Sequence, residues 1–84
     1  MTITQDEGGY YIADIHLPIG DNGITISGSG DTEAWACHRA LMKLWAVRSA
    51  LFAVLVYEYS DALRACEVII TEALNNARAR ERAA

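Results

Sequence analysis

The strongest constraint on the fold is a change in hydrophobic period near residue 31. Before that point, apolar residues alternate with polar ones in short runs separated by glycine, whereas from Thr32 on they recur every three or four residues. A period of two is typical of strands with one buried face, and a spacing of three and four is typical of amphipathic helices. The 84-residue chain therefore predicts one α+β domain in which a sheet precedes the helices.

The predicted sheet consists of short runs rich in strand-forming residues, at 1–5, 10–17 and 24–27. The second run alternates most regularly and places four apolar residues on one face, namely Tyr11, Ala13, Ile15 and Leu17. Turn residues separate the runs, at 6–9 (DEGG) and 18–23 (PIGDNG). We expect a small antiparallel β-meander within residues 1–30, with three strands, or two if the first run frays.

Residues 31–82 predict two helices. We expect segment 28–32 to end the sheet, and Asp31 to be the N-cap of the first helix, because its carboxylate is suited to accept hydrogen bonds from the free N–H groups of the first turn. We expect a break at residues 59–61, with Ser60 or Asp61 as the second cap. The apolar run 51–57 favours a buried helix, with a fourth strand as the alternative.

The first helix has more apolar surface than one sheet covers. One stripe contains Cys37, Leu41 and Leu44, and a second runs beside it through Trp35, His38, Met42, Trp45, Ser49, Phe52, Val56 and Tyr59. A subunit interface would cover the remainder, as would an antiparallel second helix. Because a chain of this size buries only about 60% of its unfolded surface, we expect a homodimer with Trp45, Phe52 and Val56 at the self-association surface.

Charge is unevenly distributed along the chain. All seven Lys and Arg residues follow residue 38, whereas six of the eleven Asp and Glu residues precede it. An acidic first half favours a basic partner and repels nucleic acid, so we expect protein binding and no direct nucleic-acid binding. The acidic residues expected to contact this partner are Asp6, Glu7, Asp14 and Asp21.

The chain offers little for catalysis. Asp14 and His16 share one face of a strand, but no nucleophile is tied to them by a motif. Cys37 and Cys66 lack zinc-ligand spacing and are expected to be buried thiols. Segment 28–32 lacks the lysine of a phosphate loop and carries Asp31 where an anion would lie. We expect no enzymatic activity, no metal and no cofactor.

The start of the sequence lacks the basic residues and apolar core of a secretory signal. The most apolar run, 50–57, is far shorter than the roughly 20 residues that a membrane-spanning helix needs. We therefore expect a cytoplasmic protein without a membrane segment.

Three short motifs resemble those of HicB-type antitoxins, at Asp6-Glu7-Gly8-Gly9-Tyr10, Leu17-Pro18 and Gly30-Asp31-Thr32-Glu33-Ala34. The resemblance covers residues 1–45. It implies a β-β-β-α fold and a domain that binds a small, basic, RNA-cleaving toxin. It does not imply operator binding, because the C-terminal half contains no helix-turn-helix or ribbon-helix-helix pattern.

These observations predict a non-enzymatic inhibitor module whose acidic face blocks the nucleic-acid-binding or active surface of a basic protein. In the first hypothesis that partner is an RNA-cleaving toxin. In the second it is a nucleic-acid-binding defence complex, and the chain is a phage-encoded inhibitor of the anti-CRISPR type, by analogy of size, charge and fold. A third hypothesis, a structural self-associating protein, depends on the apolar first helix.

Overall fold

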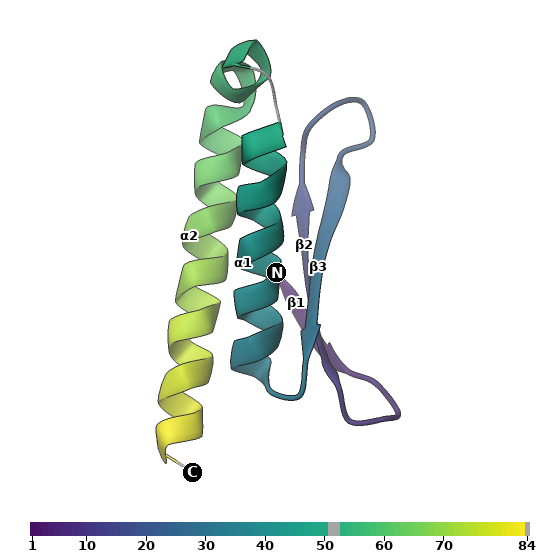
Figure 1. The fold of residues 1–84 in the computed structure, drawn as a ribbon, viewed down its shortest axis with the longest axis vertical. Helices are drawn as coiled ribbons and strands as arrows, with labels where there is room; N and C mark the ends of the chain where they lie inside the picture. The colour runs from purple at the N-terminus through teal and green to yellow at the C-terminus, as the bar shows by residue number, and fades with distance from the viewer. Residues whose placement is uncertain (51–52, 84) are drawn as a thin grey trace.

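The structure is a computed structural model that describes residues 1–50 and 53–83, with only the backbone described for residues 53–57. Its elements are, in order, β1 (Thr2–Gln5), β2 (Tyr11–Leu17), β3 (Ile24–Gly30), α1 (Glu33–Ala50) and α2 (Ala53–Ala83). A β-meander is thus followed by two helices, which confirms the predicted α+β class (Figure 1).

The sheet has the order β1-β2-β3, with both pairs antiparallel. In this register Asp14 lies between Thr2 of β1 and Ser27 of β3. The two connections fall on the predicted turn segments, where Gly9 (φ 90°) and Gly23 (φ 68°) adopt backbone conformations that side chains disfavour. The predicted alternation along β2 is confirmed, because Ala13, Ile15 and Leu17 are buried.

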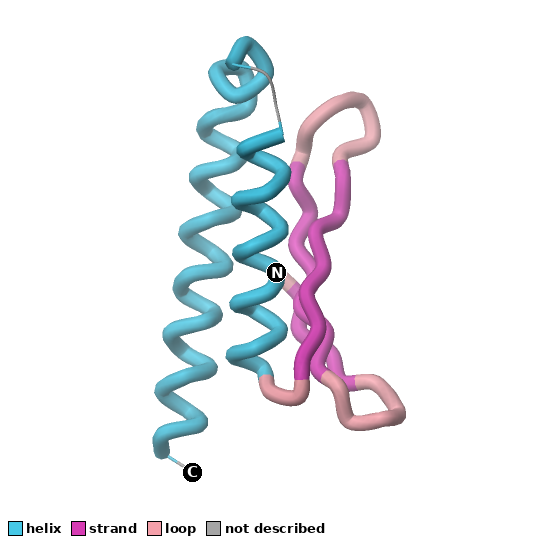
Figure 2. Tube along the Cα trace, viewed as in Figure 1, coloured by secondary structure: helices cyan, strands magenta, loops and turns pink. Residues whose placement is uncertain are grey.

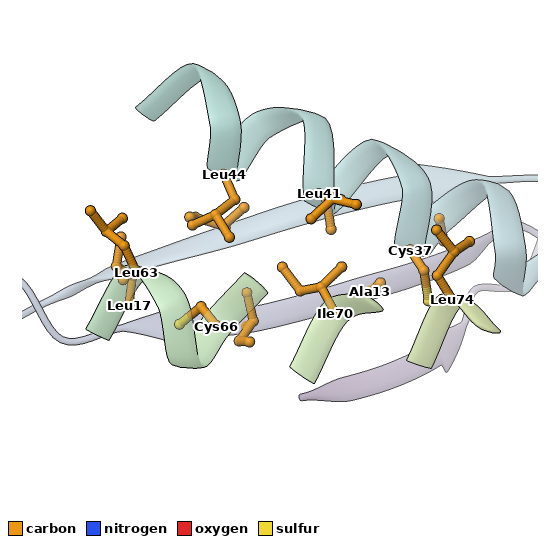
Figure 3. Packing of buried hydrophobic residues seen from close by; sticks show 13 residues of the cluster. Ala13, Leu17, Cys37, Leu41, Leu44, Leu63, Cys66, Ile70 and Leu74 are labelled. Carbon is orange, nitrogen blue, oxygen red and sulfur yellow. The ribbon is translucent and has the colours of Figure 1, made fainter. Parts of the chain in front are cut away.

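Both helices pack against the same face of the sheet (Figure 2). α1 contacts β3 and β2, while α2 contacts β2 and runs beside α1. The core lies between the helices and the sheet and includes Ala13, Leu17, Cys37, Leu41, Leu44, Leu63, Cys66, Ile70 and Leu74 (Figure 3). Among the described residues, every buried side chain is apolar.

β3 extends through Gly30, so the expectation that segment 28–32 ends the sheet is wrong at its first three residues. The glycines are strand residues against which α1 packs closely. A Cβ atom at Gly28 would lie 2.3 Å from both the Ala36 carbonyl oxygen and the Ala40 nitrogen, and one at Gly30 would lie 2.6 Å from Trp35 Cβ. Here glycine serves close contact between layers rather than a turn.

α1 begins one residue later than Asp31 would require. The Thr32 side-chain oxygen accepts a hydrogen bond from the Trp35 N–H at 3.1 Å, and the Thr32 carbonyl accepts one from the Ala36 N–H. Thr32 is therefore the N-cap of α1, and the assignment of Asp31 to that position is wrong.

α2 continues through residues 59–61, so the predicted break there is wrong. α1 ends at Ala50, and α2 begins at Ala53. Ser60 and Asp61 are exposed residues within α2. Residues 53–57 are helical, which excludes a strand there, and Leu51 and Phe52 lie outside the described residues.

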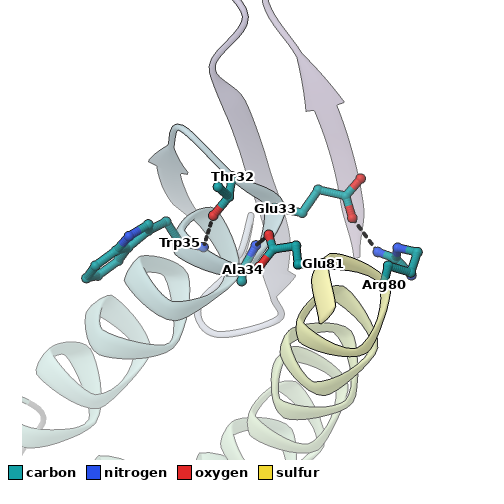
Figure 4. A network of polar contacts seen from close by, with 6 residues as sticks. All are labelled: Thr32, Glu33, Ala34, Trp35, Arg80 and Glu81. Carbon is teal, nitrogen blue, oxygen red and sulfur yellow. Dashed lines mark hydrogen bonds and ion pairs between the residues drawn. The ribbon is translucent and has the colours of Figure 1, made fainter. Parts of the chain in front are cut away.

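The end of α2 is joined to the start of α1 by polar contacts (Figure 4). Arg80 forms an ion pair with Glu33, and a Glu81 carboxylate oxygen accepts a hydrogen bond from the Ala34 N–H at 3.3 Å. Glu81 thus places negative charge at the positive end of the α1 dipole. These contacts keep the two helices aligned over the sheet.

Candidate protein-interaction surface

One face of the sheet is left uncovered by the helices. Because Ala13, Ile15 and Leu17 point into the core, the alternate residues of each strand point away from it. We call this the open sheet face, and its residues are Thr2, Thr4, Ile12, Asp14, His16, Thr25, Ser27 and Ser29. It is a surface of small hydroxyl side chains around one carboxylate.

Asp14 lies at the centre of the open sheet face. The Ser27 hydroxyl on β3 donates a hydrogen bond to its Oδ1 atom. The bond fixes the direction of the half-buried carboxylate and leaves its second oxygen for another donor. Asp14 was predicted from the sequence as a contact residue, whereas Ser27 was not. Antiparallel pairing of the predicted strands, which places Ser27 opposite Asp14, was the signal that could have revealed it.

The other predicted contact residues lie in the turns at either end of β2. Asp6 and Glu7 are exposed in the β1–β2 turn, and Asp21 is exposed in the β2–β3 turn. The two turns lie at opposite ends of the sheet (Figure 1). Asp6 also has a structural role, because its Oδ1 accepts a hydrogen bond from the Tyr10 N–H at 2.9 Å. The seven residues of β2 separate the turns by about 20 Å.

The structure thus arranges Asp6, Glu7, Asp14 and Asp21 as an extended series along β2 and does not gather them into one cluster. We call this series the acidic row. Carboxylates spread in this way meet a long basic surface better than a single cation.

The layers differ sharply in charge. No Lys or Arg lies in the sheet or its turns, and all seven lie on α1 or α2. The ion pairs found among the described residues, Arg48–Glu67 at 3.1 Å and Arg80–Glu33, both join α1 to α2. The acids of the sheet layer therefore have no cation of their own layer to neutralise them.

Asp14 and His16 do not form an acid–base pair in this arrangement. Asp14 is bonded to Ser27, and the His16 imidazole lies against the β2–β3 turn, where a Cβ at Gly23 would come within 2.4 Å of its Cε1 atom.

The cysteines belong to the core. Cys37 on α1 and Cys66 on α2 are both buried, as predicted. Burial raises the pKa of each thiol, and for Cys37 the nearby Glu33 carboxylate raises the pKa further. Such thiols are poor nucleophiles at neutral pH.

No group of three or more His, Cys, Asp or Glu side chains is placed to hold a metal ion in residues 1–50 and 53–83. Over the same ranges, the helices lack an apolar stretch of the length that crossing a bilayer requires.

The predicted self-association surface is described only in part. Trp45 is 45% exposed on α1, in line with Trp35 (53%) and Met42 (52%). Phe52 and the side chain of Val56 lie outside the described residues. The homodimer stays a prediction. Trp35 and Met42 followed the same spacing in the sequence and belong with Trp45.

Comparisons with protein-family models, with curated proteins and with solved structures found no match to this chain. The resemblance to HicB-type antitoxins therefore stays a prediction based on three short motifs. The function of this chain is inferred from the surfaces described above.

Proposed function

We propose that this chain is a non-enzymatic inhibitor module that docks its acidic row on a basic, nucleic-acid-binding protein. The observation that carries the proposal is the separation of charge between the layers. The sheet layer holds Asp6, Glu7, Asp14, Asp21 and Asp31 without one Lys or Arg, and the helices leave its open face uncovered.

The acidic row suits a surface that evolved to bind phosphates. Proteins contact nucleic acid chiefly through Lys and Arg placed along the phosphate backbone. Carboxylates spread over about 20 Å along β2 offer such cations several successive partners. Because Ser27 holds the Asp14 carboxylate in place, less side-chain entropy is lost when a partner binds it.

Electrostatic attraction of this kind mainly increases the association rate and selects the partner. The Thr and Ser hydroxyls of the open sheet face supply short hydrogen-bonding groups, and Ile12 adds an apolar contact among them. Covering the phosphate-binding surface of the partner would inhibit it without any chemical step.

The test is capture of the partner from the native host with the tagged chain, washed at low and at high salt. We expect a basic nucleic-acid-binding protein that is lost at high salt. A triple variant of the acidic row, Glu7→Gln, Asp14→Asn and Asp21→Asn, should fail to retain it. Asn at position 14 still accepts the Ser27 hydrogen bond, and Asp6 is left unchanged because it holds the turn.

A matched control removes the same charge from the helical layer through Glu58→Gln, Asp61→Asn and Glu72→Gln, all exposed on α2. This control should retain the partner as well as the unmodified chain does. Equal retention by both triple variants would show that the acidic row is not the docking surface. An RNA-cleaving toxin among the retained proteins would support an antitoxin role, and a defence complex would support a phage inhibitor.

A second candidate function is self-association into a structural assembly. Three large apolar side chains in line on α1, those of Trp35, Met42 and Trp45, favour it because each is about half exposed. Recovery of the chain alone, with a solution mass of a dimer or larger, would support this candidate over the inhibitor.

A further inference from the structure

The outer side of the seam between α1 and α2 is hollowed at two places. The first hollow, of about 340 Å³, is lined by Thr32, Ala34, Trp35, His38, Arg78 and Glu81. The second, of about 230 Å³, is lined by Arg48, Ser60, Leu63, Arg64 and Glu67. Each has walls from both helices, so the hollows follow the seam.

The two hollows open on nearly the same side of α2. Arg64 and Arg78 line different hollows and are two heptads apart on α2, so they lie on nearly the same face of that helix. Fourteen residues of helix separate them by about 21 Å. Small-molecule pockets usually measure roughly 300 to 1,000 Å³. Each hollow is near or below that lower limit, which suits a side chain of a larger partner. We call the two hollows, together with the α1–α2 seam between them, the helix groove.

An apolar stripe borders the helix groove. Trp35 and His38 form a wall of the first hollow, with their rings packed edge to face at 5.4 Å between centroids. Met42 and Trp45 continue the same side of α1 at helical spacing. Exposed fractions of 53% for Trp35, 52% for Met42 and 45% for Trp45 leave a large apolar surface in water, which typically marks an interaction site.

The charge around this stripe is positive. After Glu33, which is paired with Arg80, the charged residues of α1 are Arg39, Lys43 and Arg48. The acids of the hollows are already engaged, Glu67 with Arg48 and Glu81 with the Ala34 N–H. Within the described residues, Arg64 and Arg78 of α2 have no ion-pair partner. The two hollows together are lined by three arginines and two glutamates, so their formal charge is positive by one.

We propose that the helix groove binds an acidic amphipathic helix of a partner protein. The apolar side of that helix would cover Trp35, Met42 and Trp45, and its carboxylates would meet Arg64 and Arg78. A span of about 21 Å corresponds to roughly fourteen helical residues, the usual scale for a helix held in a groove. This surface lies on the opposite layer from the acidic row, so it goes beyond the proposed function.

Charge complementarity selects this occupant over two others. A second copy placed α1 against α1 would add a second set of Arg39 and Lys43 charges to the interface. The one acid of α1, Glu33, is already paired with Arg80, so this addition is unfavourable. Nucleic acid would satisfy the arginines but would gain little from a half-exposed Met42 between two tryptophans. An acidic amphipathic helix satisfies both features of the groove.

The test uses a helical peptide of about 18 residues, five turns long, with Leu at the a and d positions and Glu at e and g. Trp35 and Trp45 are the two tryptophans of the chain, so its intrinsic fluorescence reports directly on the groove. We expect the peptide to shift the tryptophan emission to shorter wavelength and the affinity to fall as salt is raised. Arg64→Gln with Arg78→Gln should weaken binding by roughly three- to tenfold.

Matched controls distinguish binding in the helix groove from nonspecific hydrophobic binding elsewhere on the chain. Met42→Ala should weaken binding, whereas Ile69→Ala should not, because Ile69 is also exposed (43%) but lies on α2 and outside the apolar stripe of α1. Circular dichroism checks that each variant is folded. A peptide with Lys in place of Glu should not bind.

Any one of four results would overturn the proposal. One is an unchanged emission at millimolar acidic peptide. Another is equal binding of the Lys and Glu peptides. The third is a dimer, measured by light scattering, that buries Trp45 and excludes the peptide. A stronger response to single-stranded oligonucleotide than to the acidic peptide would likewise assign the groove to nucleic acid and reject the helix.

Discussion

At the scale of single residues, the spacing between sheet and helix depends on Gly28. Its missing side chain allows the α1 backbone to lie against β3, with Ala36 and Ala40 as the facing residues. Small residues on both elements therefore set the distance at which the larger core side chains meet. Gly28 belongs to the packing of the fold and not to a turn.

Gly28→Ala is expected to destabilise the chain by about 2 to 3 kcal/mol, because the new methyl group would displace the backbone of α1. Urea unfolding followed by circular dichroism measures the change. Gly8→Ala is the control, since the nearest atom to a Cβ there lies at an ordinary 3.4 Å, and its effect should stay within about 0.5 kcal/mol. Equal losses for both substitutions would contradict the close packing of α1 on β3.

The buried thiols predict a dependence of stability on pH. Burial raises the pKa of Cys37 and Cys66 above the ordinary value of 9.0, so the folded chain holds these protons to higher pH than the unfolded chain. The stability that they contribute is complete below pH 9.0 and is lost as the pH rises through the folded pKa values.

The free energy of unfolding should therefore fall above pH 9.0, and fall less steeply in a Cys37→Ala, Cys66→Ala variant. Urea titrations from neutral to alkaline pH give both slopes. Parallel slopes would mean that the thiols ionise as easily in the folded chain as in the unfolded one.

At the scale of elements, the sequence predicted the sheet well and the helix ends poorly. Strand alternation and glycine turns are local signals, and β1, β2 and both turns lie where those signals placed them. Where a helix begins depends on which of several adjacent capping residues is used, and here Thr32, instead of the expected Asp31, is the N-cap of α1. Ser60 and Asp61 resembled a cap but lie on the solvated side of α2. The apolar run at 51–57 gave no sign that α1 would end at Ala50 and α2 begin at Ala53.

Asp61→Pro tests whether α2 is continuous. Asp61 is the ninth residue of a helix that begins at Ala53, so proline there should cost about 3 kcal/mol through a lost hydrogen bond and a steric clash. Had Ser60 capped a helix starting at Asp61, proline would occupy a favoured first-turn position. A thermal midpoint unchanged from that of the original chain would contradict the continuous helix.

At the scale of the whole molecule, the uneven charge along the sequence corresponds to the two layers of the fold. The acidic imbalance of the first half was readable from the sequence, and the structure converts it into an acidic sheet layer beneath a helical layer that holds every Lys and Arg. The sequence could not place the acidic residues relative to one another. Their spread along β2 depends on the strand register and on the positions of both turns. The helix groove was likewise hidden, because it needs residues from both helices.

The most direct test of the acidic row is the association rate with the captured basic partner, measured at increasing salt by stopped-flow fluorescence. For the unmodified chain we expect the rate to fall by roughly tenfold or more between low and high ionic strength. The Glu7→Gln, Asp14→Asn, Asp21→Asn variant should associate slowly with little salt dependence, while the α2 control variant follows the unmodified chain. If the acidic-row variant associates as fast as the unmodified chain at every salt concentration, the acidic row does not guide binding and the proposed function is wrong.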